Sequence, residues 1–250
     1  MAVQKTEGII LRKYDLRETS YILVFYTRDF GKVKGVRKGV RNPSPQFAGD
    51  LEIFTECEVL FYKRKKKGLD LISRCEALKT FLPIRKDIEK LTYANYFIEL
   101  VDAVSNDNDK NEELYDILSG SLSMLAGGAS PKRIARIFEL KLLSAIGFQP
   151  QLEECGKCGA PAGAGFRFDV TGGGIVCPRC GGTGIKMSLG TINFMRKVIS
   201  SGIARTSVIR VTKDVGKEAE KVLRSFLMYQ MNKPIRSLSF LDRLEKEGVV

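Results

Sequence analysis

The chain has 250 residues, of which 41 are Lys or Arg and 29 are Asp or Glu, so its formal net charge is +12. It contains no histidine, which excludes the commonest general base, Ser-His and Cys-His nucleophile pairs, and metal sites that use imidazole. Hydrophobic residues make up 44% of the chain, enough to bury a core, and no apolar run is long enough to span a bilayer.

The excess of positive charge indicates a polyanionic partner, with nucleic acid favoured over a membrane because no basic amphipathic tail is evident. The first residues lack the apolar stretch of a signal peptide, so we expect a soluble, cytoplasmic protein. Its six cysteines then point to metal binding or buried thiols rather than disulfides. The sequence has neither a P-loop nor a dinucleotide-binding fingerprint, which favours a non-enzymatic function.

Residues 1–80 carry the pattern of five short strands, with apolar runs or alternation between turn residues. Five strands in so short a segment predict a small closed barrel of the OB type, a fold that often holds single-stranded nucleic acid. An SH3-like barrel has the same number of strands and stays an alternative. The strands are expected at 8–11, at 20–26, from 32 onward, at 51–62 and at 69–77.

Residues 81–250 change to helical spacing and predict a helical domain. One helix has a clear start at Ser130 and Pro131 and a clear end at Gly147. A cysteine-bearing module at about 150–187 interrupts the helices. The predicted fold class is therefore α+β and multidomain, with an N-terminal five-stranded OB-type β-barrel and a helical domain that carries an inserted four-cysteine zinc module. Further helices are expected at 84–101, 114–125, 188–201, 214–232 and 237–247.

Four of the cysteines have the spacing C-x2-C-x18-C-x2-C, which is typical of a zinc site. Each C-x-x-C turn presents two thiolates on one side, and two such turns complete a tetrahedron around one Zn²⁺. Four protein ligands leave no position for water, so the zinc is expected to be structural. Cys57 and Cys75 fall on apolar faces of predicted strands and are expected to be buried thiols. The predicted zinc ligands are Cys155, Cys158, Cys177 and Cys180.

Two basic runs lie in the predicted barrel, where 17 Lys and Arg stand against 10 Asp and Glu over residues 1–80. Phe54 and Tyr62 have exposed parity nearby and are candidates for stacking on bases. Contacts of this kind reach phosphates, so binding should tolerate sequence and weaken with salt. The candidate nucleic-acid-binding residues are Lys32, Lys34, Arg37, Lys38, Arg41, Lys63, Arg64, Lys65, Lys66 and Lys67.

Several segments, in the same order along nearly the whole chain, resemble the bacterial RecO recombination-mediator family in its zinc-binding branch. They are Glu7-Gly8-Ile9-Ile10-Leu11-Arg12, Glu18-Thr19-Ser20, Gly31-Lys32 to Lys38-Gly39-Val40-Arg41, Phe138-Glu139-Leu140-Lys141-Leu142-Leu143, Gly147-Phe148 and the cysteine pairs. The resemblance implies binding to single- and double-stranded DNA, annealing of complementary strands, and partnership with RecR and with single-stranded-DNA-binding protein (SSB). It also implies that the protein helps to load RecA onto SSB-coated DNA in recombinational repair, at the bacterial nucleoid.

In this family SSB presents an acidic tail with an apolar end. Arg133 and Arg136 lie at the start of the predicted helix after Ser130, and we expect them to hold the carboxylates of that tail. Ordinary surface charges on an amphipathic helix are an equally good interpretation. A zinc-ribbon RNA-binding factor of translation or transcription is the alternative function. A zinc or cysteine enzyme is disfavoured by the four-cysteine site and the absent histidine, and a purely structural scaffold is disfavoured by the charge.

Overall fold

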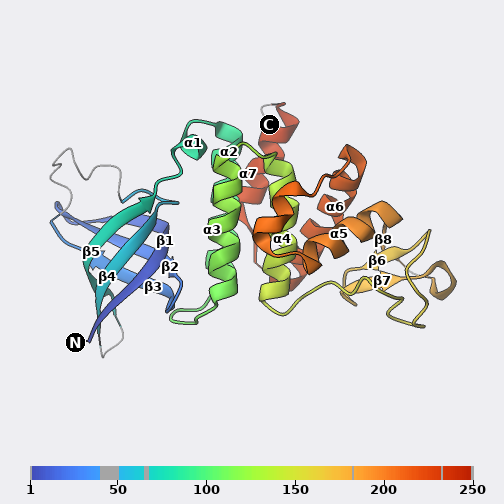
Figure 1. Ribbon diagram of the computed structural model, residues 1–250, viewed down its shortest axis with the longest axis horizontal. Coiled ribbons are helices and arrows are strands. Elements are labelled where there is room, and N and C mark those ends of the chain that lie inside the picture. The colour runs from blue at the N-terminus through green and yellow to red at the C-terminus, as the bar shows by residue number, and fades with distance from the viewer. Residues whose placement is uncertain (1, 40–50, 65–67, 182, 232, 249–250) are drawn as a thin grey trace. The chain divides into compact units, whose positions relative to one another are not determined.

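The computed structural model describes residues 2–39, 51–64, 68–181, 183–231 and 233–248. The chain forms two compact units, one made of residues 1–127 and 237–250 and the other of residues 128–236. Figure 1 shows the elements in chain order. No helix within the described ranges combines the length and the apolar character needed to cross a membrane.

Five strands form a closed barrel in the first unit, in the order β1-β2-β3-β5-β4. Strands β3 and β5 pair in parallel, while β4 returns to pair with β1 in an antiparallel ladder. This is a Greek-key closure, which confirms the predicted OB-type barrel. The strands are β1 Ala2–Leu16, β2 Ser20–Thr27, β3 Gly31–Arg37, β4 Glu56–Lys63 and β5 Asp70–Lys79.

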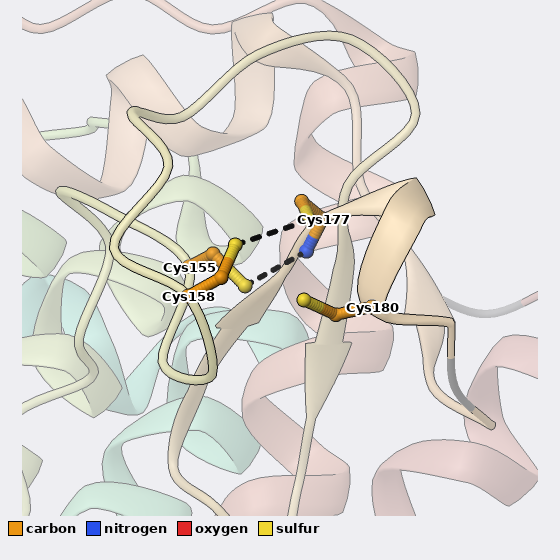
Figure 2. Close-up of side chains that lie close together, drawn as sticks. All are labelled: Cys155, Cys158, Cys177 and Cys180. Atoms are coloured by element: carbon orange, nitrogen blue, oxygen red, sulfur yellow. Dashed lines mark hydrogen bonds between the residues drawn. The ribbon is translucent and has the colours of Figure 1, made fainter.

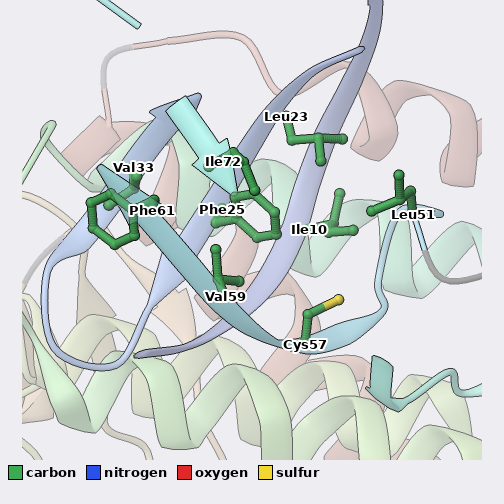
Figure 3. Packing of buried hydrophobic residues seen from close by; sticks show 9 residues of the cluster. All are labelled: Ile10, Leu23, Phe25, Val33, Leu51, Cys57, Val59, Phe61 and Ile72. Carbon is green, nitrogen blue, oxygen red and sulfur yellow. The ribbon is translucent and has the colours of Figure 1, made fainter. Parts of the chain in front are cut away.

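Apolar side chains from all five strands fill the interior of the barrel (Figure 3). Cys57 belongs to this core, as predicted, whereas Cys75 packs against it and is only half-buried. Because side chains occupy the interior, a large ligand has to bind on the outer surface. The core residues are Ile10, Leu23, Phe25, Val33, Leu51, Cys57, Val59, Phe61 and Ile72.

The fourth strand begins later than its alternation predicts. Residues 51–54 form a turn, and β4 starts at Glu56. Leu51 still reaches the core from this turn, so its apolar side chain continues the alternation of β4 although it is not part of the strand. Glu56 lies off the apolar face by alternation, yet it is buried, and its carboxylate accepts hydrogen bonds from Ser119 Oγ at 2.6 Å and from Lys79 Nζ at 3.1 Å.

Three helices of the first unit, α1, α2 and α3, come directly after the barrel in sequence. The fourth, α7, comes after the whole second unit. Asp87 caps α2 by accepting a bond from the amide of Lys90, and Asn111 caps α3 through the amide of Leu114. The C-terminal helix α7 joins α2 through Glu99, whose carboxylate accepts bonds from the amide and hydroxyl of Ser237. These helices are α1 Leu82–Arg85, α2 Ile88–Val104, α3 Glu112–Ala126 and α7 Arg236–Lys246.

The second unit combines three helices with the cysteine module. Helix α4 begins at Pro131 after Ser130, as predicted, and packs against both α5 and α6. The module contains a three-stranded sheet in the order β7-β6-β8, whose buried Phe168 meets Phe226 of α6 in an edge-to-face contact. The elements are α4 Pro131–Ala145, β6 Arg167–Asp169, β7 Gly174–Val176, β8 Ile185–Lys186, α5 Leu189–Ser200 and α6 Lys213–Met231.

Candidate metal centre and nucleic-acid interface

The two cysteine pairs converge within the second unit. The first pair precedes β6 in a turn, and the second follows β7 and ends a short 3-10 turn at Pro178–Cys180. The four sulfur atoms lie within 4.8 Å of one another, and Figure 2 shows the side chains directed toward a common centre. The structure thus brings together all four predicted ligands, Cys155, Cys158, Cys177 and Cys180.

Hydrogen bonds prepare one of the thiols for loss of its proton. The backbone amide of Cys177 donates to Cys155 Sγ at 3.3 Å, and this bond contributes most to lowering the pKa of the Cys155 thiol to about 6. Bonds from the protonated Cys180 thiol to Cys158 and Cys177 instead raise the pKa of Cys180 to about 12. All four sulfurs can be thiolates together only when a bound cation compensates their charge.

The sulfur positions fit a tetrahedral ion. Bonds of about 2.3 Å from one ion to four thiolates place neighbouring sulfurs roughly 3.8 Å apart. Cys158 Sγ and Cys177 Sγ lie 3.6 Å apart, close to this spacing. The cluster can therefore hold one metal ion, with all four ligand positions supplied by the chain.

Besides Lys34, four of the predicted nucleic-acid-binding residues are accessible at the ends of β3 and β4. Lys38, Lys63 and Arg64 are exposed, and Arg37 is half-buried. Strand β5 lies between β3 and β4, which are therefore two strand spacings, about 10 Å, apart. Through Ile72 of β5, Arg37 is level with Phe61, two residues before the end of β4. The structure therefore brings the ends of the two basic runs near each other. Arg41, Lys65, Lys66 and Lys67 lie outside the described residues.

Two lysines of β3 are engaged by acidic residues within the first unit. Lys32 is 7% exposed, and its ammonium contacts Asp102 Oδ1 at 2.8 Å and the Asp102 carbonyl at 2.6 Å. Lys34 is exposed but pairs with Asp107 at 3.0 Å. Lys32 is thus unavailable to a phosphate, which corrects its assignment as a nucleic-acid contact. Lys34 stays a candidate whose charge is partly neutralised.

The two stacking candidates differ in exposure. Phe54 is buried in the turn before β4, so the prediction that it stacks on bases is wrong. Its parity misled because residues 51–54 are not part of the strand. Tyr62, near the end of β4, is half-exposed and stays a candidate.

The arginines expected to hold an acidic tail lie on α4, but one of them is buried. Arg136 is 2% exposed and forms ion pairs with Glu139 at 2.8 Å and with Glu220 of α6 at 3.3 Å. It joins α4 to α6, so its assignment as a partner contact is wrong. Arg133 is half-buried, and its guanidinium donates to the carbonyl of Ile209 at 3.3 Å.

Beside Arg133 the structure shows a groove that the sequence did not reveal. It has a volume of about 280 Å³ and lies between α5 and the segment before α6. Phe194, Ile209 and Val215 supply apolar lining, and the cations Lys197 and Arg210 stand exposed on it. Sequence analysis predicted only a helix at 188–201 here, because a groove needs two segments that are distant in sequence.

Comparison with known proteins agrees with this architecture. Residues 1–81 match the family described as Recombination protein O N terminal, and residues 85–239 match Recombination protein O C terminal. The border between the two matches falls just after β5, where the barrel closes.

Curated relatives match over nearly the whole chain. The DNA repair protein RecO of Pelotomaculum thermopropionicum is 34% identical over 97% of this chain and 95% of its own length. That of Symbiobacterium thermophilum is 32% identical over 98% of both chains. With a barrel, helices and cysteine cluster in the matching order, the chain belongs to the RecO family of DNA repair proteins.

Proposed function

We propose that this DNA repair protein acts without catalysis, by binding single- and double-stranded DNA on the outer wall of its barrel and annealing complementary strands. The observation that carries the proposal is the group of accessible cations at the ends of β3 and β4, on a barrel whose interior is filled. Family membership favours DNA over the RNA-binding alternative. We expect the protein to act at the nucleoid, in the bacterial cytoplasm.

The physical role of the barrel is to reduce repulsion between two polyanions. Phosphate contacts by lysine and arginine release counterions, so they favour binding of any sequence and make it sensitive to salt. Strands held side by side on a cationic wall meet more often than strands in solution, because their mutual repulsion is screened. The proposed wall consists of Lys34, Arg37, Lys38, Lys63 and Arg64, together with the predicted Arg41, Lys65, Lys66 and Lys67.

We assign the ion of the cysteine cluster as one structural Zn²⁺. Thiolate ligands in tetrahedral array are the usual set for zinc, and the closed coordination leaves no site for a reacting water. In this role the ion holds the turns of the module together. Elemental analysis of the purified protein, with an expected ratio of about one zinc per chain, tests the assignment.

We further propose RecR, SSB and, indirectly, RecA as protein partners. The groove beside Arg133 suits the acidic, apolar-ended tail of SSB, because an apolar end can lie against Phe194 while Lys197 and Arg210 meet carboxylates. The proposed tail contact is therefore on α5 and the segment before α6, and not at the buried Arg136 of α4. We expect the double variant Lys197→Gln/Arg210→Gln to bind the SSB tail peptide with an affinity lower by about tenfold or more. Lys217→Gln with Lys221→Gln, exposed on α6, is the matched control.

Strand annealing on SSB-coated oligonucleotides tests the function as a whole. The variant Arg37→Gln/Lys38→Gln/Lys63→Gln/Arg64→Gln should anneal at least tenfold more slowly than wild type and lose part of its salt dependence. A control with the same net charge replaces four exposed lysines elsewhere, Lys213, Lys217, Lys221 and Lys246. Equal slowing by both variants would contradict a role for the barrel wall.

A further inference from the structure

A small polar pocket lies in the cysteine module of the second unit. None of its lining residues belongs to the barrel. It has a volume of about 110 Å³ and lies between the first cysteine turn, β6 and the loop before β8. Its polar lining comes from Lys157, Arg167, Asp169, Thr171 and Thr183. The pocket has room for one small oxyanion.

Two cations reach this pocket from different segments. Lys157 is exposed between Cys155 and Cys158, and Arg167 is half-buried on β6. The guanidinium of Arg167 donates to the carbonyl of Gly184 at 3.0 Å, which fixes its orientation and uses one of its five N–H donors. Within the described ranges, neither cation has a carboxylate oxygen within 4.0 Å.

The one carboxylate of the pocket is already engaged in its own turn. Asp169 Oδ1 accepts bonds from the hydroxyl of Thr171 at 2.7 Å and from its amide at 3.1 Å. These bonds, with a smaller contribution from the charge of Lys157, lower the pKa of Asp169. The pocket thus presents two positive charges and a threonine hydroxyl, Thr183, against one carboxylate that is satisfied locally.

We propose that this pocket binds a phosphate group of a nucleic-acid backbone, which gives the cysteine module a direct contact with DNA besides its structural role. Lysine and a fixed arginine are the side chains that recognise phosphate oxygens best, and hydroxyl groups commonly complete such sites. The inference rests on the proposed DNA binding. Inorganic phosphate offers the same oxygens, so it serves as a separate probe.

The test compares Lys157→Gln with Arg179→Gln in the full-length, zinc-loaded protein. Both residues are exposed and lie within a C-x-x-C turn, but Arg179 does not line the pocket. For single-stranded oligonucleotides, Lys157→Gln should lower the slope of log affinity against log salt by about one and weaken binding about threefold to tenfold. Arg179→Gln should match wild type. Arg167→Gln should act like Lys157→Gln, with zinc content and melting measured to establish that the module is folded.

The outcomes distinguish failure of the proposed DNA binding from failure of the phosphate pocket alone. Wild-type protein that binds no oligonucleotide at any salt concentration would overturn the proposed function, and this inference with it. Oligonucleotide binding by wild type with identical salt slopes for Lys157→Gln and Arg179→Gln would overturn the inference alone. Titration with inorganic phosphate, followed by phosphorus NMR, gives the second arm. Phosphate binding that Lys157→Gln abolishes, with an unchanged oligonucleotide slope, would identify a site for the free anion and overturn the nucleic-acid contact.

Discussion

The ammonium of Lys32 on β3 lies 2.8 Å from Oδ1 of Asp102 on α2, seventy residues later in the chain. The same carboxylate also pairs with Arg12 of β1, so one aspartate serves two cations of the barrel. Both Lys32 and Asp102 are largely buried. The pair therefore fixes α2 on the barrel and excludes Lys32 from the proposed DNA-binding surface.

Breaking this pair should have unequal effects on stability. Asp102→Asn leaves the buried Lys32 ammonium without a carboxylate, and we expect a loss of about 3–5 kcal/mol in the free energy of unfolding. Lys32→Met leaves Asp102 paired with Arg12, so the loss should be smaller, about 1–3 kcal/mol. Lys34→Met breaks only the exposed pair with Asp107 and should cost less than about 1 kcal/mol.

Denaturant unfolding of the three variants measures these differences, and oligonucleotide binding at several salt concentrations supplies a second readout. Lys32→Met should keep the wild-type salt slope, because the buried ammonium has no phosphate to contact. Equal stability losses for Asp102→Asn and Lys34→Met would contradict the assignment of a buried pair.

Gly31, at the start of β3, is required by a close approach of the segment between α2 and α3. Its φ is +63°, and an added Cβ would lie 1.9 Å from the carbonyl oxygen of Asp109. Gly31→Ala should therefore cost about 3 kcal/mol, from the left-handed backbone and the clash together.

Gly39 provides the matched control for this substitution. Its φ is +72°, and an added Cβ would meet no described atom within 4 Å. Gly39→Ala should cost only about 1–2 kcal/mol, through the backbone conformation alone. Thermal melting of both variants checks the difference, and similar losses would show that the contact with Asp109 does not constrain the barrel.

Because of Tyr26, the stability of the first unit should fall with rising pH in the alkaline range. Burial raises the pKa of Tyr26 from 10.0 to about 12, because the phenolate cannot be hydrated there. Because the pKa is higher in the folded state than in the unfolded chain, the contribution of Tyr26 to the free energy of unfolding is complete below pH 10. It is lost as the pH rises from 10 to 12, where the unfolded chain releases the proton first. The loss is at most about 3 kcal/mol.

Tyr26→Phe should show a flatter stability profile above pH 10. At neutral pH it should be about 1 kcal/mol less stable, since the hydroxyl donates to the carbonyl of Asn111 at 3.3 Å. Some alkaline loss should persist, because burial raises the pKa of Tyr115 as well. Denaturant unfolding across this pH range measures the profile.

Loss of a cysteine ligand should destabilise the second unit. With Cys177→Ser we expect the proposed zinc to be lost and the melting transition to fall by roughly 10 °C, because the ion would hold the two cysteine turns together through all four thiolates. Chelation of the metal from wild type should have the same effect. Cys75→Ser, outside the cluster, should retain zinc and melt close to wild type. Normal melting of Cys177→Ser together with lost DNA binding would contradict a structural role for the ion.

Local sequence patterns predicted the order of the elements and the convergence of four cysteines. The spacing of Cys155, Cys158, Cys177 and Cys180 was sufficient to identify the cluster, since each C-x-x-C turn is a local structure. The start of α4 at Pro131 followed from its capping residues. The alternation over 51–62 failed at its first half, where Leu51 reaches the core from a turn.

By itself, the sequence determined the fold class, the cysteine cluster and the total charge, because these depend on periodicity, spacing and composition. Only the tertiary structure decided which cations are accessible. In the sequence nothing distinguishes Lys32 from Lys38, or Arg136 from Arg133. In the structure, however, Lys32 pairs with Asp102 of α2 and Arg136 pairs with Glu220 of α6, and both cations are buried. Burial of a charge depends on partners many residues away, so it is a property of the folded chain and not of the local sequence.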